Sequence, residues 1–175
     1  MARPTSAVFP LAAVVLVSIV VSVAGDARFI FSTCKLTKNP NCVKTLATDP
    51  RSTKATTVRE LADVALDIAA AAVKDGSASI NDKHQRYAKA EPLGTLLLGC
   101  TWIYDRAAPE VAAASIAFRS GGYRDAVMHQ MAAHYAGVMC DELITRNSKV
   151  SVVADDNKKT IERSDVAVDL IQLLY

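Results

Sequence analysis

The 175-residue sequence has no excess of charge of either sign. It contains 20 Lys and Arg residues against 18 Asp and Glu residues, which leaves a formal net charge of +2. Proteins that bind nucleic acids normally carry a basic patch and a high isoelectric point, so we expect no nucleic-acid partner. Charged residues make up 22% of the chain. This ordinary share gives no indication of disorder.

The sequence also lacks the motifs of common catalytic and metal sites. It has no G-x-S-x-G, H-E-x-x-H, Walker loop or G-x-G-x-x-G pattern. It has no C-x2-C pair, and its three histidines are scattered, which argues against a zinc site. Asp125 and His129 have the i, i+4 spacing of a surface pair on a helix. We therefore expect no metal, no cofactor and no enzymatic activity, and the absence of an N-x-S/T sequon predicts no N-glycosylation.

Only one long hydrophobic run is present, and it lies at the N-terminus. Residues 1–24 combine Arg3, an apolar stretch over residues 8–21 and small residues at 22–24, which is the pattern of a secretory signal peptide. A proline interrupts the run, which is short for a membrane span of about 20 residues. We expect cleavage between Ala24 and Gly25 or one residue later, and a secreted protein without membrane association after cleavage.

Four cysteines follow this segment, and an even number in an oxidising compartment predicts two disulfides. They are Cys34, Cys42, Cys100 and Cys140. Four cysteines permit three pairings, and spacing alone does not choose between them. The first two lie close together within residues 25–50, a segment that prolines interrupt. We interpret this segment as an N-terminal helical hairpin closed by a disulfide between these two cysteines.

The rest of the chain, residues 51–175, has the hydrophobic periodicity of helices and little strand character. Apolar residues recur every three or four positions, which places them on one face of each helix. Long helices are expected over residues 56–74, 92–119, 123–146 and 158–174. Four helices with short connections predict an all-α fold, an up-down-up-down four-helix bundle.

Several helix features lead to specific expectations. Thr57 and Glu60 form a candidate capping box. Gly76 suits the end of the first helix, which leaves residues 77–90 as a loop or short helix. Pro109 should kink the second helix. The third helix has a row of small residues and a row rich in methionine, and the sequence does not choose between them. The second helix has the most regular apolar stripe: Leu97, Cys100, Tyr104, Ala107, Val111, Ala114 and Phe118.

The bundle also favours one pairing of the remaining cysteines. Helices two and three meet at the turn around Gly121, and Cys100 and Cys140 lie roughly 20 residues before and after it, hence at similar height in an antiparallel pair. A Cys100–Cys140 bond is therefore geometrically natural. It closes a loop of about 41 residues, worth roughly 4 kcal/mol in the chain-entropy model.

Three groups of motifs follow the predicted signal peptide. They are Ile30-x2-Thr33-Cys34-x2-Thr37-x2-Pro40-x-Cys42-x3-Leu46 with Asp49-Pro50-Arg51-Ser52, then Leu97-x2-Cys100-x3-Tyr104-x2-Ala107, and finally Ala132-Ala133 ahead of Cys140. Together with the predicted signal peptide, the four cysteines and the helix order, these motifs resemble the plant invertase/pectin methylesterase inhibitor family. The resemblance implies a four-helix bundle with an N-terminal hairpin and two disulfides, Cys34–Cys42 and Cys100–Cys140.

The resemblance further implies inhibition of a cell-wall carbohydrate-active enzyme in the apoplast. The partner is a pectin methylesterase or an acid invertase, bound one-to-one over the active-site cleft. Invertase inhibitors of the family often carry Pro-Lys-Phe in the turn between the second and third long helices. Here Gly121, Gly122 and Tyr123 occupy those positions. Since only the aromatic residue is kept, we favour pectin methylesterase as the target.

Five residues are candidates for contacting the partner. Gly121, Gly122 and Tyr123 form a turn whose aromatic residue is a plausible insertion tip or simply the start of the third helix. Trp102 lies off the apolar stripe, and Arg106 one turn later could stack on it. Trp and Arg are enriched at binding hot spots, although Trp102 could instead pack under the N-terminal hairpin, which we consider the more ordinary interpretation.

A basic cluster in the 77–90 segment is a further candidate, for acidic pectin or an acidic enzyme cleft. It consists of Lys83, His84, Arg86 and Lys89. Most such clusters are only solvated, and His84 is expected to be so.

Two other functions fit a secreted helical bundle. A diverged, non-inhibitory member could carry a small apolar ligand between its helices, which requires a well-formed internal pocket. The small residues of the third helix favour tight packing instead. A secreted enzyme would require strongly perturbed acids in a cleft, and no catalytic constellation supports it.

Overall fold

The computed structural model describes residues 27–147 and 151–175, and every regular element in this part is helical. Residues 27–37 form a first helical segment. The hairpin continues with α2 (Cys42–Leu46) and the short helix η1 (Pro50–Lys54). The expected signal peptide, residues 1–24, lies outside the described residues. The four long helices are α3 (Val58–Tyr87), α4 (Leu93–Arg119), α5 (Tyr123–Thr145) and α6 (Ala154–Gln172).

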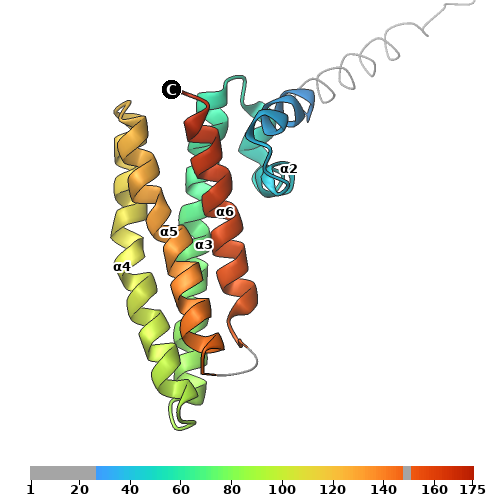
Figure 1. Cartoon of the computed structure of the whole chain (residues 1–175). Coiled ribbons are helices and arrows are strands. Elements are labelled where there is room, and N and C mark those ends of the chain that lie inside the picture. Colours follow the sequence, from blue (N-terminus) through green and yellow to red (C-terminus); the bar gives the residue numbers. More distant parts are fainter. Residues whose placement is uncertain (1–26, 148–150) are drawn as a thin grey trace, which may run out of the picture.

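The long helices form the expected bundle (Figure 1). Each packs mainly on two neighbours, in the order α3, α4, α5, α6 and back to α3, so α4 and α6 lie on opposite corners. The hairpin helix α2 packs on α3 and α6, and Figure 1 shows it beside that pair. The outward face of α4 and α5 is therefore left free by the hairpin. Within the described residues, no helix has the length and hydrophobicity needed to cross a bilayer.

Helix α3 begins as predicted but ends later. Its capping box is formed, since Thr57 Oγ1 accepts a hydrogen bond from the Glu60 amide at 3.2 Å and the Glu60 carboxylate accepts one from the Thr57 amide at 3.1 Å. The helix then runs through Gly76 to Tyr87. The expectation of a loop or a separate short helix over residues 77–90 was wrong, because Gly76 is not a cap and α3 continues through it. A Cβ atom there would lie 2.9 Å from the ring of Tyr104, so glycine serves a close helix–helix approach.

Helix α4 matches its predicted bounds, and all seven residues of its apolar stripe are buried. It ends at Arg119, where Gly121 adopts a φ of 87° in the turn to α5. This left-handed conformation favours glycine. Pro109 lies inside the helix.

The structure resolves which face of α5 is buried. The row of small residues, Ala126, Ala133, Gly137 and Cys140, faces the core, whereas the methionine-rich row faces outward. Gly137 permits the close approach of α6, because a Cβ atom there would lie 2.6 Å from Ile161 Cγ1. Helix α6 begins at Ala154, four residues before the predicted start at Lys158.

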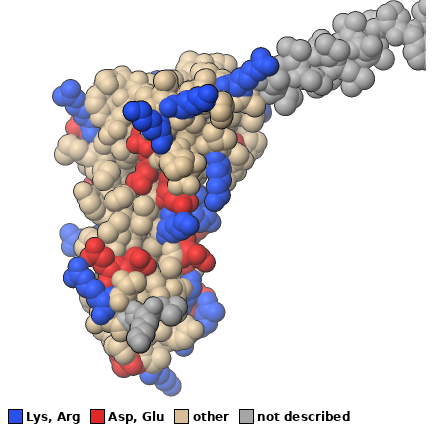
Figure 2. Space-filling model, turned by 45° about the vertical axis from the view of Figure 1, so that its right-hand side comes forward, with Lys and Arg blue, Asp and Glu red and all other residues tan. Residues whose placement is uncertain are grey.

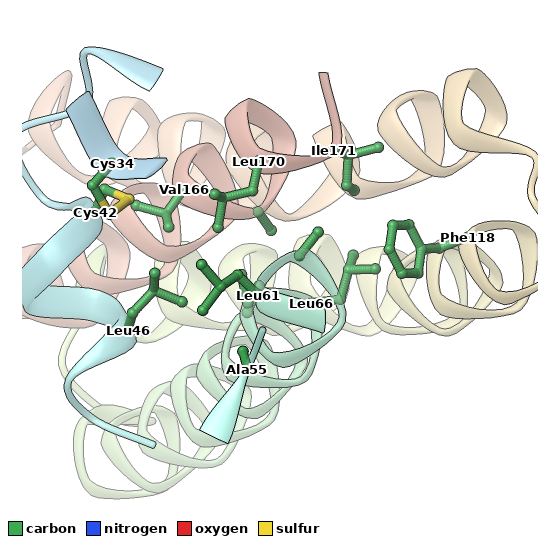
Figure 3. Close-up of a cluster of buried hydrophobic side chains, with 14 of the residues drawn as sticks. Cys34, Cys42, Leu46, Ala55, Leu61, Leu66, Phe118, Val166, Leu170 and Ile171 are labelled. Atoms are coloured by element: carbon green, nitrogen blue, oxygen red, sulfur yellow. A yellow bond between two sulfur atoms is a disulfide. The ribbon is translucent and has the colours of Figure 1, made fainter. Parts of the chain in front are cut away.

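Both predicted disulfides are present, Cys34–Cys42 and Cys100–Cys140. The first staples the hairpin and contributes to the core at that end of the bundle, where Leu46 packs with Leu61 and Val166 (Figure 3). The second joins α4 to α5 within the other core cluster.

Candidate partner-binding surface

The structure places Trp102 and Arg106 on the outward face of α4. Trp102 is 63% exposed, and Arg106, one turn later, is also exposed. The interpretation that Trp102 packs under the hairpin is therefore wrong, since the hairpin packs on α3 and α6 instead. The expected stacking of Arg106 on Trp102 is not among the cation–π contacts of the described residues, which involve Phe31, Phe118 and Tyr175.

Large apolar side chains extend this exposed surface across α4 and α5. Besides Trp102, the exposed residues on these two helices are Ile116, Met128, Tyr135 and Met139. A hollow of about 210 Å³ lies between the helices. Its lining consists of Ile103, Arg106, Ala107, Ala132, Tyr135, Ala136 and Met139. We call this surface the α4–α5 face, and large exposed apolar side chains make it a candidate interaction site.

Sequence reasoning found only part of the α4–α5 face. It named Trp102 and Arg106 but none of the α5 residues on this face, because the two apolar rows of that helix could not be ranked. Tyr135, Met128 and Met139 belong to the row that faces away from the core. The presence of two apolar rows on one helix could have revealed this face, because a helix in a four-helix bundle cannot bury both rows.

The turn between α4 and α5 exposes glycine rather than an aromatic ring. Gly121 is exposed and Gly122 is half-buried. Tyr123 is the first residue of α5, and its ring centroid lies 5.5 Å from that of Phe118, against the core. The half-buried Tyr123 therefore packs against the end of the bundle and does not form a protruding tip.

The basic cluster of the 77–90 segment is largely paired. Lys83 binds Asp156 of α6, and Arg86 binds Asp82 one turn before it. His84 lies in α3 rather than in a loop, with its Nδ1 atom 3.1 Å from the Gly94 carbonyl oxygen. The solvated cluster expected from the sequence is thus mostly a set of intramolecular contacts.

The other two histidines pair with carboxylates on neighbouring helices. His129 Nδ1 lies 2.7 Å from Glu110 Oε2, and His134 Nδ1 lies 2.7 Å from Asp165 Oδ1. Among the described residues, no group of three or more His, Cys, Asp or Glu side chains is arranged to hold a metal ion.

Two groups with raised pKa values have structural explanations. Burial raises the pKa of Tyr104 to about 12, while its hydroxyl hydrogen-bonds Asn157 and Thr160 of α6. Burial also raises the pKa of Asp169, against the effect of a hydrogen bond from the Asn39 amide at 2.7 Å. The first contact joins helices and the second joins the hairpin to α6, so neither supports the enzyme hypothesis.

A hollow of about 640 Å³ is a groove between α3 and α4. It is open to solvent, because Lys74, Asn81 and Asp105 in its lining are exposed. An apolar carrier needs an enclosed pocket between its helices, and this groove does not provide one.

Comparisons with known proteins agree with this geometry. The family model described as "Plant invertase/pectin methylesterase inhibitor" matches residues 28–172. The chain is also similar to a solved structure titled "Crystal structure of mutant form A of a pectin methylesterase inhibitor from Arabidopsis", with a TM-score of 0.69 and 20% sequence identity over 82% of this chain and 95% of that chain. A search of curated proteins finds no match. The structural likeness establishes the fold, and the family match shows that the chain belongs to the plant invertase/pectin methylesterase inhibitor family.

Proposed function

We propose that the chain is a secreted inhibitor of pectin methylesterase that lays its α4–α5 face over the enzyme's active-site cleft in a one-to-one complex. The family match over residues 28–172 carries this proposal, since it makes the chain a protein inhibitor of cell-wall enzymes and not an enzyme. Delivery to the apoplast rests on the signal-peptide pattern of residues 1–24.

The composition of the α4–α5 face supports its role in docking. Trp102, Arg106 and Tyr135 are of the residue types that dominate binding energies at protein interfaces. Met128 and Met139 add flexible apolar surface that adapts to a partner. The hairpin leaves this face uncovered, so a partner reaches it without rearrangement of the inhibitor.

The rigidity of the bundle supports steric inhibition. The Cys100–Cys140 bond joins the two helices that carry the α4–α5 face. Small residues pack α5 tightly against the core. A preordered surface loses little conformational entropy on binding, and no catalytic group is needed to block a cleft.

The α4–α5 turn favours pectin methylesterase over acid invertase. In the family, invertase inhibition is associated with Pro-Lys-Phe at this turn, whereas this chain has Gly121, Gly122 and Tyr123. Tyr123 packs on Phe118 and is only half exposed. The turn therefore lacks both the cation and the protruding aromatic side chain of the invertase-type motif.

The test is a parallel titration of a pectin methylesterase and a cell-wall acid invertase at mildly acidic pH, with oxidised protein beginning at Asp26. We expect stoichiometric loss of pectin methylesterase activity only. Trp102→Ala should weaken this inhibition at least tenfold, the size of effect typical of a hot spot, about 1.4 kcal/mol or more.

Leu36→Ala is the matched control, because Leu36 is a large apolar residue equally exposed on the hairpin, away from α4 and α5. It should leave inhibition unchanged. Inhibition of invertase that Tyr123→Ala abolishes would contradict the proposal and support the invertase alternative. Loss of neither activity, across several isoforms of each enzyme, would mean that the fold is kept without an inhibitory surface.

A further inference from the structure

A second surface feature lies on the hairpin side of the molecule. A hollow of about 310 Å³ is formed where α2 packs near the first half of α6. Its charged lining consists of Lys44 from α2 and of Asp155, Lys158, Lys159, Glu162 and Arg163 from α6. We call it the α2–α6 hollow. Three of its four cations lie within residues 158–163 of α6, and the fourth, Lys44, joins them from a distant segment of the sequence.

The cations of the α2–α6 hollow are mostly not neutralised by partners. Four cations face two carboxylates. Lys158 approaches Glu162 only at 3.9 Å, and no salt bridge among the described residues involves Lys44, Lys159 or Arg163. Figure 2, which brings the hairpin side forward, shows Lys and Arg side chains close to Asp and Glu side chains on this face. The hollow therefore keeps cations available for an anionic ligand while also presenting acceptors.

This mixed lining indicates the chemistry of the ligand. Ammonium and guanidinium groups bind carboxylates by charge-assisted hydrogen bonds. The Glu162 carboxylate and the hydroxyl of Thr48, which also lines the hollow, can accept hydrogen bonds from alcohol groups. A ligand with spaced single negative charges and many hydroxyls matches both sets of groups.

A compact dianion such as phosphate fits less well. Asp155 lines the hollow from the first turn of α6, where its charge already complements the positive end of the helix dipole. It would repel a concentrated charge placed there. Spaced carboxylates can instead meet Lys44, Lys159 and Arg163 separately.

We propose that the α2–α6 hollow binds a short polyuronate through carboxylates of successive sugar units. The choice of a polyuronate rests on the proposed function, because a pectin methylesterase hydrolyses the methyl esters of pectin, releases methanol and leaves de-esterified pectin, a polymer of uronic acid. Such binding would hold the inhibitor near wall regions where its target has already acted.

The experiment is a titration of the oxidised protein with trigalacturonate near pH 6 at low salt, followed by calorimetry. A dissociation constant of about 1 mM or tighter is expected, with affinity falling as salt is added, because the site is exposed. The methyl-esterified trimer and neutral maltotriose should not bind. Equal binding of the esterified trimer, or no binding of trigalacturonate, would overturn the proposal.

Charge-reversal variants separate a site from general attraction. Lys44→Glu/Lys159→Glu should weaken trigalacturonate binding at least tenfold. The matched control, Lys54→Glu/Lys74→Glu, makes the same charge change at exposed positions that do not line the hollow, and should change the affinity less than twofold. Equal weakening by both variants would overturn the proposal. No enzyme is present in this assay, so its failure leaves the inhibitor proposal standing, and failed inhibition leaves this binding result standing.

Discussion

At the scale of single residues, two helix glycines differ in what an added Cβ atom would meet. Gly137 of α5 faces α6, where a Cβ atom would meet Ile161 Cγ1 at 2.6 Å and the Asn157 backbone oxygen at 2.9 Å. At Gly99 of α4, a Cβ atom would meet only the end of the Leu143 side chain, at 2.8 Å. Backbone cannot yield as easily as a terminal methyl group, so the two positions should respond differently to the same substitution.

Gly137→Ala is expected to destabilise the fold by roughly 2 to 3 kcal/mol through overpacking. This corresponds to a fall in melting temperature of about 5–10 °C for a domain of this size. Gly99→Ala, the matched control, should be neutral or stabilising by up to about 1 kcal/mol, since alanine favours helix and Leu143 can shift. Thermal unfolding followed by circular dichroism measures both. Equal destabilisation by the two substitutions would contradict this account of the α5–α6 contact.

The raised pKa of Asp169 gives a prediction about pH. The pKa of Asp169 in the folded protein lies above the unfolded value of about 3.9. The contribution of this carboxyl group to stability is therefore fully present below the unfolded pKa and is lost as the pH rises through the folded pKa. Asp169→Asn removes this loss and still offers Asn39 an acceptor. The variant should therefore be more stable than the parent at pH 7, with the difference closing as the pH falls toward 4.

Urea unfolding of both proteins at pH 7 and pH 4 tests the effect of Asp169. Asp75→Asn, which makes the same substitution at an exposed carboxylate of α3, is the control variant for both measurements. A parent protein that is more stable than Asp169→Asn at neutral pH would mean that the ionised carboxylate helps to hold the hairpin.

At the scale of elements, the two disulfides are expected to contribute unequally. Cys100–Cys140 joins residues 40 apart, whereas Cys34–Cys42 joins residues 8 apart. In the chain-entropy model the longer loop is worth roughly 4 kcal/mol and the shorter about 2.6 kcal/mol. Cys100→Ser/Cys140→Ser should therefore lower the free energy of unfolding more than Cys34→Ser/Cys42→Ser. Urea unfolding in oxidising buffer measures both losses, and the reverse order would refute the loop-entropy explanation.

The elements also mark how far the sequence alone could lead. The stripe of α4 was predictable because its spacing of three and four residues fixes one face of a helix, and all its members are buried. The end of α3 was not predictable, because Gly76 suits either a helix cap or a close contact. The choice depends on Tyr104, a residue on another helix.

The candidate surfaces have the same dependence on tertiary contacts. Trp102 could be placed off the apolar stripe of α4 from spacing alone. Its exposure depends on where the hairpin packs, which local patterns do not encode. The α2–α6 hollow also depends on tertiary contacts, because Lys44 and Lys159 line the same hollow only when the hairpin has packed near α6.

At the scale of the whole molecule, the bundle separates the two proposed binding surfaces. Helices α4 and α6 occupy opposite corners, and the hairpin packs on α3 and α6. The α4–α5 face and the α2–α6 hollow therefore lie on different sides of the protein (Figure 1). An inhibitor arranged in this way could bind its target enzyme on one side and a polyuronate on the other.

This separation predicts that each surface can be disabled without the other. Lys44→Glu/Lys159→Glu should leave the apparent inhibition constant for pectin methylesterase within twofold of the parent, measured at an ionic strength high enough to screen long-range charge effects. Trp102→Ala should weaken inhibition but leave trigalacturonate affinity within twofold. Distant sites without shared partners act additively, so a protein with all three substitutions should show both defects at their separate sizes. A large loss of inhibition in the lysine variant would instead place the hollow within the enzyme interface, because only contact with the enzyme could couple residues so far from α4 to the inhibited state.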